Sequence, residues 1–550
     1  MTGNSESRLK TPSLPLIGYV ALSVLMAASY ALMWSTSVRH TEGHFTYALD
    51  DPYIHLAIAR NLAHHGVWGV TQYAVSSASS SPLWTVLVAL TIKLGGNNVL
   101  WPFIIGVACS AATTLLVFRK MIQRGLSVWL ALASAILIFA GGPLHVLPFS
   151  GMEHCLQILL DLVFGFWLLD TMVRKPESRD LIAALAISTA MCLCRYESLF
   201  LVVIPFALCL WRREWRLAGA FAAGPILAVG GFGLYSHLMG MPWVPNSILI
   251  KGHLPHSSAL EFLRVLINQV FWSLYNDCPA LGCLVLIGVA TAGVLRLRVL
   301  RDKTAALQIW LWTIVVASLL HAGLAMVGLF YRYEAYLIVS LTTAILLAIH
   351  EVWRLLIGVL TPPSTTVRRL VAALSLPLAV VLISRANDAL TKAPNACQDI
   401  YLQQIQMARF VVRFYPTGRL AANDIGAVSY FSHVHLLDIV GLATDDIRQL
   451  RIERRFTTAT LTPEIEAFKP DVIIAYPEWF KGSIALPPFV IPVEKWTIPP
   501  VTSAASNYVE FYATTPESAD RLRKELNEFK PTLPSAVNAE SLGGSKTFTH

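Results

Sequence analysis

One polar run in the first half of the chain decides the fold: DDPYIHLAIARNLAHHG, residues 50–66. It lies between segments apolar enough to enter a membrane. An acidic residue followed by proline predicts a helix with Asp51 as its N-cap and Pro52 as its first residue. Gly66 predicts a left-handed C-terminal stop. The apolar residues recur at spacings of three and four, which indicates a helix lying on the membrane surface: Ile54, Ala57, Ile58 and Leu62.

The two neighbouring carboxylates are predicted to differ. If Asp51 caps the helix, its oxygens accept hydrogen bonds from backbone amides. Asp50 then has no assigned partner and is the freer carboxylate. From these residues alone, Asp50 is either a catalytic group or a solvated loop side chain, and Asp51 is more readily a helix cap than a catalyst.

The composition indicates a polytopic membrane protein. The 550 residues are 55% hydrophobic and 14% charged, whereas soluble domains carry about 25% charged residues. The net charge of +8 is read as a topology signal and not as a sign of nucleic-acid binding, because Lys and Arg collect in short loops. The eight cysteines include no CxxC pair and no metal-ligand spacing. Cys192 and Cys194 are predicted to be core residues.

The spans and loops follow from this pattern. Residues 1–13 are expected to be a cytoplasmic tail, 14–384 a transmembrane domain of about 11–13 helices, and 35–81 its first outer loop. Residues 82–94 are too short to cross alone and are expected to be re-entrant. Full spans are predicted near 14–34, 99–118, 127–142, 152–172, 181–194, 198–211, 216–239, 278–296, 304–329, 334–354 and 369–384.

A soluble α/β domain is predicted on the outer side at 385–535, followed by a flexible tail at 536–550. It should contain a helix near 398–415. Short strands are expected near 420–423, 435–439, 472–475 and 509–512.

Charged and polar side chains collect in the predicted outer loops. Mixed charges on one face of a helical bundle mark a functional site. A carboxylate there could deprotonate an acceptor hydroxyl, and Arg or Lys could bind a phosphate. No nucleotide-binding GxxxxGK[ST] or GxGxxG motif is present. The candidates are Asp50, Asp51, Glu153, Arg195, Glu197, Asn246, Lys251 and Arg332.

Several of these residues also have a plain structural interpretation. Glu153 can tether the span that follows it, and Arg195 with Glu197 can be a structural pair. Lys251 can extend its ammonium group to lipid head groups. Asp424 and Asp438 can simply end strands of the outer domain.

The first outer loop resembles that of the GT-C superfamily of membrane glycosyltransferases. The resemblance rests on DDPYI at 50–54, on Asn61-Leu62 and on SSPLW at 80–84. Within the superfamily, the chain most resembles the bacterial branch that includes the mycobacterial terminal arabinofuranosyltransferase, over roughly residues 45–480. Further motifs similar to that branch are SGME at 150–153, RYE at 195–197, PNS at 245–247 with Lys251, NDIGA at 423–427 and LDIVGL at 437–442.

This resemblance implies a GT-C-like enzyme in the bacterial inner (plasma) membrane that takes a sugar from a polyprenyl-phosphate donor on the extracytoplasmic face, typically with inversion. The first carboxylate of the pair, Asp50, is the expected base. The acceptor would be an envelope glycan, lipid or protein, membrane lipids would surround the enzyme, and a divalent cation is possible. Supporting acids would be Asp51, Glu153 and Glu197, and phosphate-binding candidates Arg195, Lys251 and Arg332.

Two positions depart from that branch, since Pro52 replaces a smaller residue and Glu197 replaces an Asp. Both departures weaken the inference about which sugar is moved more than the inference about the class of reaction. Two other functions stay open. A secondary transporter would show repeated halves with broken helices, and no such symmetry is visible. A non-catalytic envelope assembly protein would keep the fold without needing Asp50.

Overall fold

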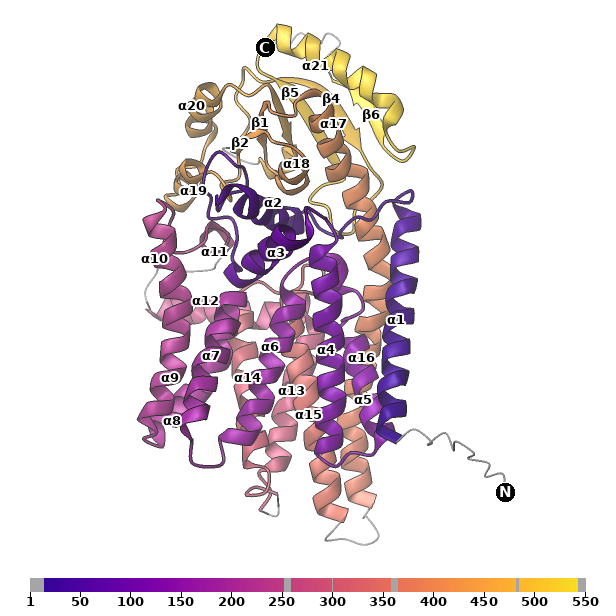
Figure 1. Cartoon of the computed structure of the whole chain (residues 1–550), viewed down its shortest axis with the longest axis vertical. Coiled ribbons are helices and arrows are strands. Elements are labelled where there is room, and N and C mark those ends of the chain that lie inside the picture. The colour runs from indigo at the N-terminus through magenta and orange to yellow at the C-terminus, as the bar shows by residue number, and fades with distance from the viewer. Residues whose placement is uncertain (1–13, 252–258, 299, 358–364, 481–483, 543–550) are drawn as a thin grey trace, which may run out of the picture.

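The computed structural model describes residues 14–251, 259–298, 300–357, 365–480 and 484–542. It has two parts stacked along its long axis, a helical bundle and a smaller sheet domain (Figure 1). Between them lie two helices of the first loop, α2 (Asp51–His65) and α3 (Pro82–Gly95). Residues 1–13 and 543–550, parts of the two predicted tails, lie outside the described residues.

Seven segments of the bundle are long and apolar enough to cross a membrane, or eight if one bent pair counts as a span. A hydrocarbon core needs about 20 apolar residues per helix, so the chain is a multi-pass membrane protein. The seven comprise α1 (Leu14–His40), α4 (Trp101–Gln123), α6 (His154–Thr171), α9 with α10 (Trp215–Pro225 and Gly231–Leu238), α14 (Ala305–Leu324), α15 (Ala335–Ile357) and α16 (Thr365–Ile400).

Shorter helices complete the bundle. They explain why the structure has seven or eight long apolar spans and not the predicted 11–13. Every predicted span contains a helix, but four of these helices have 17 residues or fewer. They lie beside the longer ones (Figure 1), which is how short helices are shielded from lipid. They are α5 (Val128–Gly141), α7 (Ser178–Cys194), α8 (Leu199–Trp211) and α13 (Pro279–Leu295), which forms the bent pair with α12 (Ala259–Trp272).

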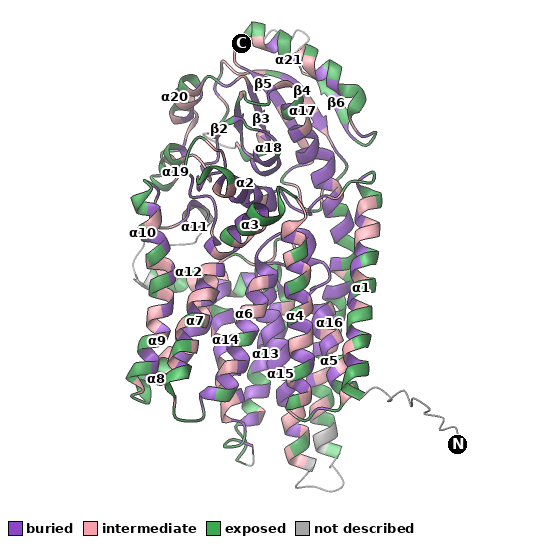
Figure 2. Cartoon of the chain, in the orientation of Figure 1, coloured by how far each residue is buried: buried purple, intermediate pink, exposed green. Residues whose placement is uncertain are grey.

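Close packing holds the bundle together. At Gly165 of α6, a Cβ atom would lie 2.3 Å from the indole of Trp310 on α14, so only glycine lets these two helices approach. Cys192 and Cys194 are fully buried, as predicted for core residues. Figure 2 shows buried positions along the bundle interior and exposed positions over much of α21 (Pro516–Phe529).

The sheet domain contains six strands in the order β2-β1-β3-β5-β4-β6. The first three strands of that order are parallel, and the remaining pairs are antiparallel. The four predicted strands are confirmed as β1 (Arg419–Ala422), β2 (His435–Asp438), β3 (Val472–Ala475) and β5 (Tyr508–Ala513). The other two are β4 (Ile491–Thr497) and β6 (Asn538–Ser541), and the helices between strands include α18 (Gly426–Phe431), α19 (Asp445–Ile452) and α20 (Thr458–Phe468).

Two local predictions about the sheet domain differ from the structure. The predicted tail from 536 begins with β6, which pairs with β4 and is therefore ordered structure. The predicted domain boundary at 384–385 falls inside α16, which continues through residues 401–405 into α17 (Gln406–Phe414). Polar residues after 384 end the apolar character of this helix without ending the helix itself.

The helix α2 was predicted to lie on a membrane surface, and this is wrong. All its residues from Pro52 to Asn61 are buried, because α3 packs on one side and α18 of the sheet domain on another. The predicted stop is confirmed, since Gly66 has a φ of 69° and donates to backbone oxygens of Asn61 and Leu62. His55, Arg60 and Asn61 of α2 are therefore buried against protein partners, whereas His64 and His65 at its end are exposed.

Candidate active site

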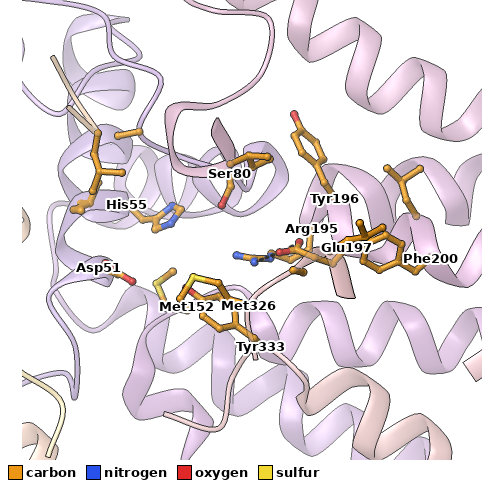
Figure 3. A pocket seen from close by; sticks show the side chains of 17 residues that line it. Asp51, His55, Ser80, Met152, Arg195, Tyr196, Glu197, Phe200, Met326 and Tyr333 are labelled. Atoms are coloured by element: carbon orange, nitrogen blue, oxygen red, sulfur yellow. Dashed lines mark hydrogen bonds and ion pairs between the residues drawn. The ribbon is translucent and has the colours of Figure 1, made fainter. Parts of the chain in front are cut away.

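A cavity of about 260 Å³ lies where the bundle meets the sheet domain. Side chains from α2, from the 78–80 loop and from the bundle point into it (Figure 3). Apolar side chains form much of the wall, and seven polar or charged residues gather within it. The polar lining residues are Asp51, His55, Ser80, Arg195, Tyr196, Glu197 and Tyr333.

The carboxylate of Asp51 is held by Arg332. The Arg332 Nη2 atom lies 2.6 Å from Asp51 Oδ2. The Arg332 side chain is 1% exposed and that of Asp51 is 31% exposed. The guanidinium group of Arg332 also lies 4.8 Å from the centre of the Tyr333 ring. Asp51 thus faces the cavity, while the cation behind it is fixed by an ion pair and by stacking on an aromatic face.

Arg195 joins two carboxylates. It follows the last residue of α7 in an extended conformation, φ −153° and ψ 133°. Its Nη1 donates to Glu153 Oε1 at 2.7 Å, and its Nε donates to Glu197 Oε2 at 3.0 Å. Glu153 is fully buried behind the cavity, whereas Glu197 lines it. Because Glu153 is desolvated, removal of Arg195 would leave a buried charge without its partner.

His55 lies between the cavity and Glu153. Its Nδ1 is 3.3 Å from the hydroxyls of both Ser79 and Thr85, and its Nε2 is 3.9 Å from Glu153 Oε2. Burial lowers the pKa of His55 below its usual value, so the ring is neutral at neutral pH. His55 was not among the predicted site residues. The sequence marked His55 only as a polar residue that lies outside the row of apolar residues on α2.

Asp50 occupies the position predicted for Asp51. It is the N-cap residue of α2, although its side chain makes no capping hydrogen bond to that helix. Its carboxylate instead accepts hydrogen bonds from the backbone amides of Gly426 at 2.5 Å and Ala427 at 2.8 Å. Burial and the neighbouring carboxylate of Asp424 raise the pKa of Asp50 well above its usual range. The prediction that Asp50 is the freer carboxylate is therefore wrong.

Asn246 supports the cavity from one side. It begins α11 (Asn246–Lys251), its backbone amide donates to the Ser77 oxygen at 2.9 Å, and its side-chain amide donates to the Leu442 oxygen at 3.1 Å. Ile248 of the same helix and Leu442 line the cavity. Lys251 ends α11, and its side chain is outside the described residues.

A second, larger cavity of about 870 Å³ lies on the other side of the 324–334 segment. Arg385 and Glu334 form an ion pair at 2.6 Å in its wall. Residues 328–331, which line this second cavity, all have positive φ, from 41° to 77°, which is rare for residues other than glycine.

Metal binding finds no support in these side chains. Among the residues that the structure describes, no group of three or more His, Cys, Asp and Glu could hold a metal ion. Glu153 and Glu197 both turn to Arg195 instead. The divalent cation that the resemblance made possible therefore has no ligand set in the described part of the chain.

The structure brings five predicted site residues to one place: Asp51, Glu153, Arg195, Glu197 and Arg332. Asp50 and Asn246 lie at its edge, in contacts with the sheet domain. Tyr333 was missed as a site residue, although it directly follows a predicted one, Arg332. Its ring lies 5.4 Å from the guanidinium carbon of Arg195 and 4.8 Å from that of Arg332.

Comparisons with known proteins bear on the fold. No curated protein matches the chain. A family model described as a domain of unknown function (DUF8728) matches residues 398–514. The crystal structure of ArnT from Cupriavidus metallidurans bound to undecaprenyl phosphate is similar at 13% identity and a TM-score of 0.50, covering 90% of this chain and 98% of that one. Its apo state matches at 13% identity and a TM-score of 0.49, covering 91% and 99%.

These matches are too distant in sequence to assign an activity. Over nearly its whole length, the chain has an ArnT-like GT-C fold with a small C-terminal sheet domain.

Proposed function

We propose that the protein is a membrane glycosyltransferase that moves a sugar from a polyprenyl-phosphate donor to an acceptor hydroxyl. The observation that carries this proposal is the pairing of a cavity-facing carboxylate, Asp51, with the buried cation of Arg332 at the end of an apolar bundle. A lipid donor needs both an apolar surface for its tail and a cation for its phosphate. The shared fold with ArnT, whose structure holds undecaprenyl phosphate, supports the same donor class.

Asp51 is the base that the geometry favours. It lines the cavity, whereas Asp50 does not and already accepts two backbone hydrogen bonds. In the proposed step, Asp51 takes the proton of the acceptor hydroxyl, whose oxygen attacks the anomeric carbon of the donor sugar. The bond from that carbon to the phosphate oxygen breaks, and its electron pair leaves with the phosphate. A single displacement of this kind inverts the anomeric configuration.

Arg332 and Arg195 would stabilise the leaving phosphate. The Nε and Nη1 atoms of Arg332 are buried and have no hydrogen-bond partner within the described part of the chain. An anion beside Asp51 would lie close to the guanidinium group that pairs with it, and fixed cations in a poorly hydrated site stabilise charge that develops in the transition state. Glu153 and Glu197 would hold Arg195 in place.

The charge distribution supports an extracytoplasmic site in the bacterial inner membrane. Several basic clusters follow helices at the end of the bundle that lies far from the sheet domain, for example Arg174-Lys175 after α6 and Arg212-Arg213 after α8 (Figure 1). Cytoplasmic loops carry such an excess of Lys and Arg. The cavity and the sheet domain would then face outward, toward an envelope glycan, lipid or protein acceptor.

The test is transfer by purified protein from a panel of radiolabelled polyprenyl-phosphate sugars to a crude envelope acceptor. Wild type would be compared with Asp51→Asn and, as a matched control, with Asp520→Asn, whose side chain is 80% exposed on α21. We expect transfer that Asp51→Asn abolishes and Asp520→Asn preserves, and the active donor would identify the sugar. Donor binding without transfer by wild type, for every sugar and acceptor, would contradict the proposal and favour the non-catalytic alternative.

A further inference from the structure

The loop helix α2 holds the sheet-domain helix α18 at both ends. At one end, the Asp50 carboxylate accepts hydrogen bonds from the amides of Gly426 and Ala427. At the other, the guanidinium group of Arg60 donates to the backbone oxygens of Ser429 at 3.2 Å and Ser432 at 3.3 Å, and to that of Tyr430. We call these hydrogen bonds the α2–α18 contact.

This contact is buried and closely fitted. Asp50 is 8% exposed and Arg60 is 7% exposed, so neither charge is solvated and each relies on its hydrogen bonds. A Cβ atom on Gly426 would lie 2.2 Å from the backbone oxygen of Asp50 and 2.5 Å from its Oδ2. The approach of the two segments therefore requires glycine at 426, independently of any charge.

A neighbouring hydrogen-bond network extends the contact into the sheet domain. Asp424, next to the Asp50 carboxylate, accepts hydrogen bonds from Gln404 at 2.8 Å and from the Tyr476 hydroxyl at 3.1 Å. Gln404 lies between α16 and α17, and Tyr476 follows β3. The contact is thus continuous with the core of the sheet domain.

The position of α18 affects where one part of the cavity wall lies. After α18, three residues lead into β2, and the segment that follows β2 carries Leu442 into the cavity wall. The carboxylate of Asp438 orders this segment by accepting from the amides of Val440 and Ala443 at 2.8 Å and 2.7 Å. The sheet domain therefore supplies part of the cavity, and α2 fixes where that part lies.

We propose that Asp50 and Arg60 are positioning residues, which set the shape of the cavity by docking α18, and that Asp50 does not take the acceptor proton. Asp50 acts on the substrate through the sheet domain, whereas Asp51 acts from inside the cavity. The effect on transfer rests on the proposed function, but the docking itself does not.

The experiment compares three variants that break the same contact in different ways: Asp50→Asn, Arg60→Gln and Gly426→Ala. Hydrogen–deuterium exchange of peptides covering 419–444 is measured in detergent, beside transfer kinetics. We expect exchange at least about tenfold faster in all three, because local opening controls exchange, with a raised acceptor KM and a smaller change in kcat. Arg60→Lys keeps the charge and should restore part of the protection. Asp51→Asn should exchange as wild type.

The readouts separate the possible failures. Wild-type exchange in all three variants would overturn the proposal, as would loss of kcat in Asp50→Asn with wild-type exchange, since that result would make Asp50 the base. If a variant does not fold, Arg60→Lys supplies the same comparison with a milder change. If no sugar is ever transferred, the exchange data still decide whether the contact docks the sheet domain, although the proposed function would then have failed.

Discussion

Each of two faces at the start of α2 carries an aspartate, but one faces the sheet domain and the other faces the cavity. On the sheet-domain face, Asp50 and Arg60 form hydrogen bonds with backbone groups of α18 and of the residue that follows it. On the cavity face, Asp51 is paired with one cation, and its side chain remains 31% exposed. Two adjacent aspartates thus receive different roles because a helix turns successive side chains in different directions. Docking needs satisfied groups, and catalysis needs a group that a substrate can reach.

The largest expected effect is on the cavity face. Asp51→Asn should lower kcat by about 10²–10⁴-fold, the usual contribution of a general base, and should also lower thermal stability, because the buried guanidinium group of Arg332 loses its carboxylate partner. Steady-state transfer kinetics and thermal unfolding in detergent check the two parts. A wild-type kcat in this variant would remove Asp51 from the mechanism.

Arg195 should matter for both stability and activity. Arg195→Met leaves Glu153 buried without its partner, which should cost roughly 3–5 kcal/mol of unfolding free energy. The matched control is Arg413→Met, because Arg413 also pairs with a carboxylate, that of Glu528, but these two side chains are 43% and 56% exposed. That pair should contribute only about 0–1 kcal/mol. Equal destabilisation in the two variants would show that burial of the Arg195 network does not matter.

Arg332→Lys should have an intermediate effect. Lysine keeps the charge but loses the planar fork and its stacking on Tyr333. We expect the KM for the donor to rise about tenfold, which corresponds to about 1.4 kcal/mol, with kcat less affected. Arg354→Lys is the control, since Arg354 lies on α15 with its side chain 56% exposed. An unchanged donor KM would argue against phosphate binding by Arg332.

The smallest expected effect concerns the docking face and pH. Burial raises the pKa values of both Asp50 and Asp424 in the folded protein. Their contribution to stability is therefore complete below the ordinary carboxyl pKa of about 4 and is lost as pH rises through the raised values. Asp424→Asn should flatten this dependence and raise the midpoint temperature at pH 8 by a few degrees, for about 1 kcal/mol. Identical pH profiles for variant and wild type would contradict this assignment.

The sequence predicted the helical bundle well because apolar length is a local property. Each predicted span contains a helix, and four strands of the sheet domain lie where β-rich segments were found. The motif residues Glu153, Arg195, Glu197 and Arg332 were also identified, because ionisable groups at membrane ends are informative in any such sequence.

The exchange of roles between Asp50 and Asp51 could not be predicted from the sequence. Whether a carboxylate meets water, an arginine or a backbone amide depends on a partner that is distant in the chain, and Gly426 lies 376 positions after Asp50. Pro52 correctly indicated the start of a helix, but it did not indicate which of the two aspartates would be the N-cap residue. Arg60 was missed for the same reason, since its partners lie in the sheet domain.

The most direct test of the central claim is the rate of a single transfer event at saturating donor and acceptor, measured for Asp50→Asn and Asp51→Asn. Saturation compensates for a misplaced cavity wall but not for a missing base. The account predicts that Asp50→Asn recovers most of the wild-type rate, whereas Asp51→Asn stays about 10²-fold slower or more. A lasting deficit in Asp50→Asn together with a wild-type rate in Asp51→Asn would contradict it.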